Sequence, residues 1–76
     1  MNVQNLYCLY DRGINAYMGK LIEAENDIHA RLIFDAGVEI YKDNAAMEDI
    51  ELRYIGIVTR DDDSIQVVQD KVRRVA

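Results

Sequence analysis

The alternation of apolar and polar positions predicts a β-hairpin at the start of the chain. Residues 6–10 (LYCLY) and residues 16–24 (AYMGKLIEA) each place successive side chains on opposite faces of a strand. The segment 11–15 between them (DRGIN) contains residue types that favour turns. Because the first strand carries apolar or aromatic groups on both faces, we expect it to be buried on both sides or to offer an aromatic ring to a partner.

A helical period follows from about residue 27 to residue 40. Asn26 is a favourable N-cap, and Asp27 places a negative charge at the positive end of the helix dipole. Gly37 weakens the last turn. We expect a broad apolar face to pack on the sheet, formed by Ile28, Leu32, Ala36 and Ile40 and flanked by Ile33 and by the row Ala30, Phe34 and Val38.

The second half of the chain predicts two more strands. Residues 42–49 are polar and read as a connection with one helical turn at 44–48. Residues 50–59 alternate at first and are then apolar on both faces, which predicts a central position in a sheet. Residues 61–64 (DDDS) predict a turn, and residues 65–68 a short final strand.

These elements predict an α+β domain of order β-β-α-β-β, in which one helix packs on a small four-stranded antiparallel sheet. A chain of 76 residues allows a single small domain, 1–76, and we expect a flexible basic end at 70–76. So short a chain buries a modest core, which favours self-association into a homo-oligomer. The residues predicted to form the core include Leu9, Ile22, Ile28, Leu32, Leu52, Ile55 and Ile57.

The composition narrows the class of protein. A hydrophobic content of 50% indicates a folded chain. Cys8 is the only cysteine, which excludes an intramolecular disulfide and favours a reducing cytoplasm. No apolar run approaches the roughly 18 residues that a membrane-spanning helix requires, and no signal-peptide pattern is present. We therefore expect no membrane association.

The residues that could support chemistry are not arranged for it. His29 does not share a helical face with both Asp27 and Asp35, because neighbours on a face lie three or four residues apart. The acidic run at 61–63 lacks the ligand spacing of a calcium loop, and Cys8 has no basic neighbour to activate its thiol. The four glycines never form a phosphate-binding spacing. We expect no enzymatic activity, no metal site and no cofactor.

The charge is acidic overall but unevenly distributed. The formal net charge of −5 opposes binding to a phosphate backbone and by itself favours a protein partner. The aspartates at 61–63 form an acidic tip, whereas Lys71, Arg73 and Arg74 crowd the end of the chain. A basic end on an acidic body is therefore expected.

Three short segments together resemble a known family. They are residues 7–12 (YCLYDR), the pair Asn26–Asp27, and residues 48–56 (EDIELRYIG). Over roughly residues 5–63 the chain resembles the small nonstructural protein of gokushovirus-like microviruses, a family described as DNA-binding and linked to single-stranded genome synthesis or packaging. The family often carries proline in two of its loops, whereas this chain has none, so loop geometry is expected to differ. The resemblance implies a non-enzymatic phage accessory protein in the host cytoplasm.

Two functions remain open at this point. One is binding of single-stranded DNA, with strand tyrosines stacking on bases and basic side chains contacting phosphates. The other is an acidic protein-interaction module that is homo-oligomeric and binds a viral or host protein, for example as an inhibitor of a host factor. Of the strand tyrosines, Tyr7 and Tyr17 are expected to be the freer ones. The candidate nucleic-acid-binding residues are Tyr7, Arg12, Tyr17, Lys20, Arg53, Arg60, Lys71, Arg73 and Arg74.

Overall fold

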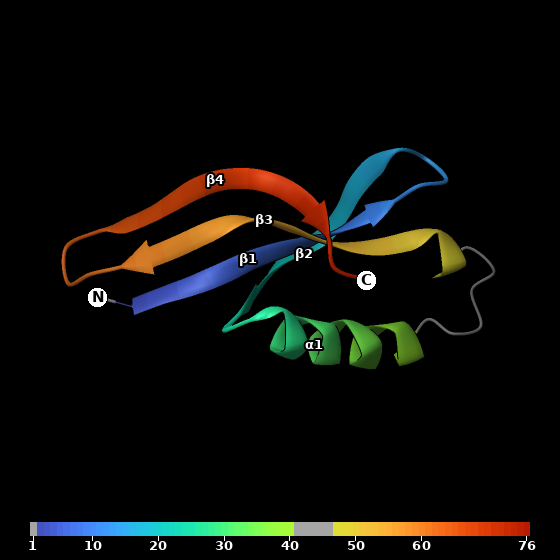
Figure 1. The fold of residues 1–76 in the computed structure, drawn as a ribbon, viewed down its shortest axis with the longest axis horizontal. Coiled ribbons are helices and arrows are strands. Elements are labelled where there is room, and N and C mark those ends of the chain that lie inside the picture. The colour runs from blue at the N-terminus through green and yellow to red at the C-terminus, as the bar shows by residue number, and fades with distance from the viewer. Residues whose placement is uncertain (1, 41–46) are drawn as a thin grey trace.

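The computed structural model describes residues 2–40 and 47–76 and confirms the predicted order of elements. Four antiparallel strands form one sheet in the order β2-β1-β3-β4, and one helix lies beside it (Figure 1). The protein is therefore a small α+β fold. The elements are β1 (Asn2–Asp11), β2 (Ala16–Ala24), α1 (Asp27–Ile40), the short 3-10 helix η1 (Met47–Asp49), β3 (Ile50–Arg60) and β4 (Ile65–Arg74).

The first hairpin forms as predicted, with Tyr10 opposite Tyr17 in the β1–β2 ladder. In the turn, the backbone N–H of Gly13 donates to the Asp11 carboxylate at 2.8 Å. Asn15 adopts a positive φ of 54°, a conformation that asparagine tolerates better than most residues. The hairpin thereby holds the two tyrosines side by side at one end of the sheet.

The two faces of the sheet have different surroundings. One face, called here the helix face, carries the core and packs against α1. The opposite face, called here the open face, has no element packed over it within the described part of the chain. The buried core of the helix face consists of Tyr7, Ala24, Ala30, Leu52 and Tyr54, with Leu9, Ile22, Phe34, Val75 and Ala76 packed around it.

The helix has the predicted bounds, and its N-cap is confirmed by a 2.8 Å hydrogen bond from the His29 N–H to the Asn26 side chain. The predicted core-facing row was wrong. Ile28 and Leu32 are 76% and 64% exposed, whereas Ala30 is fully buried. At 3.6 residues per turn, residues two apart lie about 200° apart around the axis, so only one of the two rows can face the sheet.

The remaining core predictions were mixed in their outcome. Leu52 is fully buried, as expected, while Leu9 and Ile22 are partly buried against the core. Ile55 and Ile57 are only partly buried, because they lie on a strand whose neighbours do not cover them completely.

The central position predicted for β3 is confirmed, since it lies between β1 and β4. β4 is longer than predicted and continues through polar residues to Arg74. The ladder explains this extension, because Tyr54 pairs with Arg73 and backbone hydrogen bonds then join Leu52 to Val75 and Ala76. Residues 70–74 of the basic end thus lie in β4, and Val75 and Ala76 follow it. The helical turn predicted at 44–48 overlaps η1 at residues 47 and 48; positions 44–46, like the side chains of Val38 and Ile40, lie outside the described residues.

Candidate nucleic-acid interface

Aromatic and charged side chains from all four strands and the first turn meet at one end of the open face. Strand register explains this gathering: Tyr10 pairs with Tyr17 on one side and with Glu51 on the other, while Arg53 pairs with Arg74. We call this group the arginine–tyrosine cluster; its members are Tyr10, Arg12, Tyr17, Glu51, Arg53 and Arg74.

A buried carboxylate holds the cluster together. The Glu51 residue is 5% exposed, and three guanidinium groups approach its oxygens. Arg53 lies at 3.0 Å, Arg74 at 3.4 Å and Arg12 at 3.5 Å. A buried charge needs such partners to offset its loss of hydration. One carboxylate cannot neutralise three cations, so the cluster keeps an excess of positive charge even with Asp49 at 3.8 Å from Arg12.

The aromatic rings extend the same site toward solvent. Tyr10 and Tyr17 form an edge-to-face pair with ring centroids 5.0 Å apart. The Arg53 guanidinium lies 3.5 Å from the centre of the Tyr10 ring, and its hydrogen bond to Tyr17, supported by Glu51, raises the pKa of Arg53. Tyr17 remains 48% exposed. Tyr17 is therefore the ring of this pair that is open to a ligand.

The expectation that the Tyr7 ring is free was wrong. Tyr7 is fully buried on the helix face, and its hydroxyl donates a 2.7 Å hydrogen bond to Asp27. Burial, and then the bond to Asp27, raise the pKa of Tyr7 to about 12. Asp27 also accepts two hydrogen bonds from Arg73, which lies over the Tyr54 ring. Tyr7 and Arg73 thus belong to the polar border of the core, away from the cluster.

The other basic candidates lie apart from the cluster too. Arg60 makes a two-pronged ion pair with Glu23 at 2.5 and 2.8 Å, so its charge is already matched. Lys20 on β2 and Lys71 on β4 have no ion pair within residues 2–40 and 47–76. Of the residues predicted from sequence, the fold brings together Arg12, Tyr17, Arg53 and Arg74.

Sequence reasoning missed Glu51, the centre of the cluster, and Tyr10, which packs beneath Arg53. A signal for Glu51 was present, because residues 51 and 53 lie on the same face of a strand and carry opposite charges. The contribution of Arg74 had no such signal, since it depends on the register of β4 against β3.

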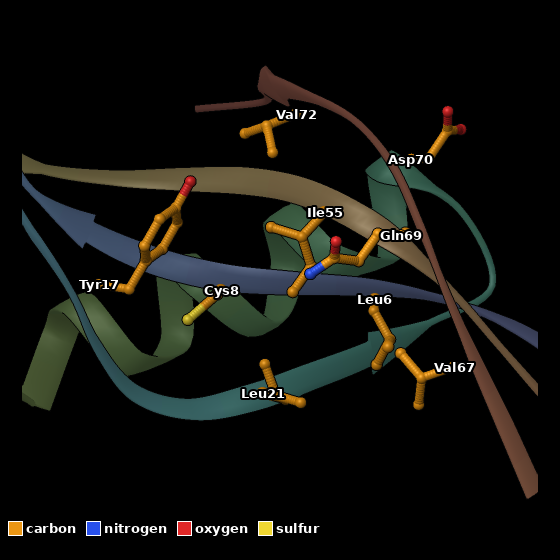
Figure 2. A pocket seen from close by; sticks show the side chains of 10 residues that line it. Leu6, Cys8, Tyr17, Leu21, Ile55, Val67, Gln69, Asp70 and Val72 are labelled. Carbon is orange, nitrogen blue, oxygen red and sulfur yellow. The ribbon is translucent and has the colours of Figure 1, made fainter.

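An apolar groove adjoins the cluster on the open face. It has a volume of about 470 Å³, and Figure 2 shows side chains from all four strands around it. Tyr17, a member of the cluster, is also one of the residues that line the groove (Figure 2). The apolar side chains that line the groove are Leu6, Cys8, Leu21, Ile55, Val67 and Val72.

Within the described residues, no group of His, Cys, Asp and Glu side chains is suited to hold a metal ion. The helix found there is too short and too polar to cross a membrane. No protein-family model, curated protein or solved structure matches the chain.

Proposed function

We propose that this chain is a non-enzymatic accessory protein of a gokushovirus-like microvirus that binds single-stranded DNA in the host cytoplasm, during genome synthesis or packaging. The observation that carries the proposal is the meeting of three guanidinium groups beside the exposed Tyr17 ring. The resemblance of residues 7–12, 26–27 and 48–56 to the microvirus family supplies the biological setting.

The cluster offers separate groups for bases and for phosphates. Tyr17 stacks on a base, an interaction that contributes about 1–3 kcal/mol and tolerates any sequence. Arg12 and Arg74 contact phosphates, because their side chains are 46% and 58% exposed. Arg53 is 26% exposed and keeps Glu51 and the tyrosines in place. With a net charge of −5, binding is weak and sensitive to salt.

The test is a fluorescence-anisotropy titration of a labelled single-stranded oligonucleotide at two salt concentrations. We expect Tyr17→Ala to raise Kd by about 5- to 150-fold, the equivalent of a lost stacking contact. Arg74→Ala weakens binding and reduces the salt dependence by about one phosphate contact. Arg60→Ala is the matched control, because it removes one positive charge that Glu23 already neutralises. Binding that is absent, or that Arg60→Ala weakens as much as Arg74→Ala, contradicts the proposal.

A second candidate is an acidic protein-interaction module that self-associates and binds a viral or host protein, including a host factor that it inhibits. Two observations favour it. Carboxylates already neutralise Arg60 and Arg73, and β4 is exposed along its whole length. A stable oligomer with no affinity for the oligonucleotide supports this candidate against the first.

A further inference from the structure

β4 is an unprotected edge of the sheet. It occupies the last position in the order β2-β1-β3-β4 (Figure 1), and every residue from Ile65 to Arg74 is exposed. Ile65, Val67 and Val68 are 70%, 61% and 49% exposed. The outer N–H and C=O groups of such a strand are free to pair with another strand. Proteins protect such edges with charged side chains, bulges or proline, and the segment 65–69 of β4 has none of the three.

The opposite edge is less suited to pairing. In β2 the ladder with β1 is irregular between Tyr7 and Leu9, and Gly19 there has a positive φ of 74°. A bulge of this kind bends and twists a strand. β4 is instead regular from Ile65 to Gln69, where each residue pairs in sequence with β3, and its irregularity begins only after Gln69. The regular segment 65–69 is therefore the best pairing surface.

The charges around β4 are complementary to those of a second copy in the antiparallel direction. Asp62 and Asp63 precede the strand and Lys71 lies near its other end. These three side chains make no ion pair within the described part of the chain. Antiparallel self-pairing brings the acidic tip of each copy to Lys71 of the other, twice in one interface.

The register follows from the same charges. Centring the pairing on Asp70 or on Lys71 would place like charges directly opposite each other, which is unfavourable. Centring it on Val67 places the segment 65–69 against itself and brings Asp63, which precedes this segment, near Lys71 of the other copy, which follows it. We propose that two copies of this chain associate through antiparallel β4–β4 pairing centred on Val67, forming one continuous eight-stranded sheet.

This dimer has a consequence for the arginine–tyrosine cluster. The two-fold axis of an antiparallel pair of identical strands is perpendicular to the sheet, so equivalent residues point to the same side. Both open faces, and with them both clusters, then lie on one side, and both copies of α1 lie on the other. Val67 lines the groove in each copy, so the two grooves adjoin at the axis. The pairing itself does not depend on DNA binding; only the shared use of the two clusters rests on the proposed function.

The first experiment measures the mass of the full chain by sedimentation equilibrium over a wide concentration range. We expect a monomer–dimer equilibrium, the monomer being 8.8 kDa. Val67→Lys places two ammonium groups opposite each other at the axis and is expected to give a monomer. Val3→Lys is the matched control, because Val3 is 48% exposed on β1 and lies away from the β4 edge. Circular dichroism of both variants verifies that they remain folded.

A charge exchange tests the direction of pairing. Lys71→Glu is expected to raise the dimer Kd about tenfold, since it replaces two attractive pairs by two repulsive ones. Adding Asp63→Lys to Lys71→Glu restores the attraction and the affinity. A chain that is monomeric at all concentrations, or a dimer unaffected by Val67→Lys, overturns the pairing while leaving DNA binding by the cluster intact. A dimer that responds as expected but binds no oligonucleotide supports the pairing and rejects the proposed function.

Discussion

Gly56 is a position at which one added methyl group would disturb the sheet directly. A Cβ there would collide with the backbone carbonyl of Val68 and lie 3.1 Å from Cα of Gln69. Since these are backbone atoms, they cannot rotate away, and we expect Gly56→Ala to lower the free energy of unfolding by about 1–3 kcal/mol. Gly37→Ala is the control: its Cβ meets nothing within 4 Å, and in a helix it is expected to stabilise by about 0.5–1 kcal/mol. Urea denaturation measures both, and equal effects would contradict the close approach of β3 and β4.

Because of Tyr7, we expect the free energy of unfolding to depend on pH in the alkaline range. Its hydroxyl donates to Asp27, and its pKa is raised to about 12 by burial and by that bond. The unfolded chain has a tyrosine pKa of about 10, so this stabilisation is present below about pH 10 and is lost as the pH rises toward 12. Titration of the phenolate absorbance should show a late step near pH 12, which Tyr7→Phe removes; Tyr54, whose pKa is also raised by burial and by its hydrogen bond to Asp70, titrates late in both proteins. The variant should also lose less stability than the wild type over the same rise in pH. If the step that Tyr7→Phe removes lies near pH 10, as for an ordinary tyrosine, the pKa of Tyr7 is not raised and the prediction is wrong.

At the scale of the element, substitutions in α1 test which of its two apolar rows stabilises the fold: the row with Ile28 and Leu32 or the row with Ala30 and Phe34. Phe34 packs against the core beside Ala30, whereas Leu32 is 64% exposed. We expect Phe34→Ala to lower the free energy of unfolding by about 2 kcal/mol, less than for a fully buried phenylalanine. Leu32→Ala is expected to change it by less than about 0.5 kcal/mol, because surface substitutions usually have small effects. Thermal and urea denaturation of the two variants decide the point, and the reverse order of effects would restore the row predicted from sequence.

The sequence predicts the elements of this fold better than their faces. Local signals set the hairpin, the Asn26 cap and the helix bounds, because turn chemistry and capping depend on neighbouring residues. The rotation of α1 had no local signal, since its two apolar rows are similar in sequence. Tyr7 and Arg73 donate hydrogen bonds to Asp27, which lies on the same side of the helix as Ala30 and Phe34. These bonds therefore turn the row that contains Ala30 and Phe34 toward the sheet.

The candidate site shows the same division between local and long-range information. Tyr17 and Arg12 come from one hairpin and were found from residue type and position. Their meeting with Arg74 depends on a ladder between β3 and β4 and on the length of β4, which its polar sequence does not reveal. Burial of Tyr7 depends on the same long-range packing. The sequence identifies a tyrosine on a strand that is apolar on both faces. It does not show which of those faces α1 covers.

At the scale of the whole molecule, charge placement is more informative than net charge. The net charge of −5 opposes binding to DNA. Glu23 and Asp27 form ion pairs with Arg60 and Arg73, however, so the excess positive charge remains on the arginine–tyrosine cluster at one end of the open face. A single cluster of this size has few phosphate contacts. Two clusters on the same side of a dimer would bind one strand together, because the second contact becomes intramolecular once the first has formed.

This arrangement predicts a dependence on oligonucleotide length. Each phosphate neutralised on a single strand changes the slope of log K against log salt by about −0.7, so Arg12 and Arg74, the two arginines that contact phosphates, give a slope of about −1.4 for one cluster. A strand long enough to reach both clusters of a dimer should show about twice the slope of a short one, together with tighter binding. Anisotropy titrations with oligonucleotides of increasing length measure both quantities. The monomeric Val67→Lys variant should show one slope at all lengths. If the wild-type dimer also shows one slope at all lengths, the two clusters bind DNA separately. Their position on the same side of the dimer then has no role in binding.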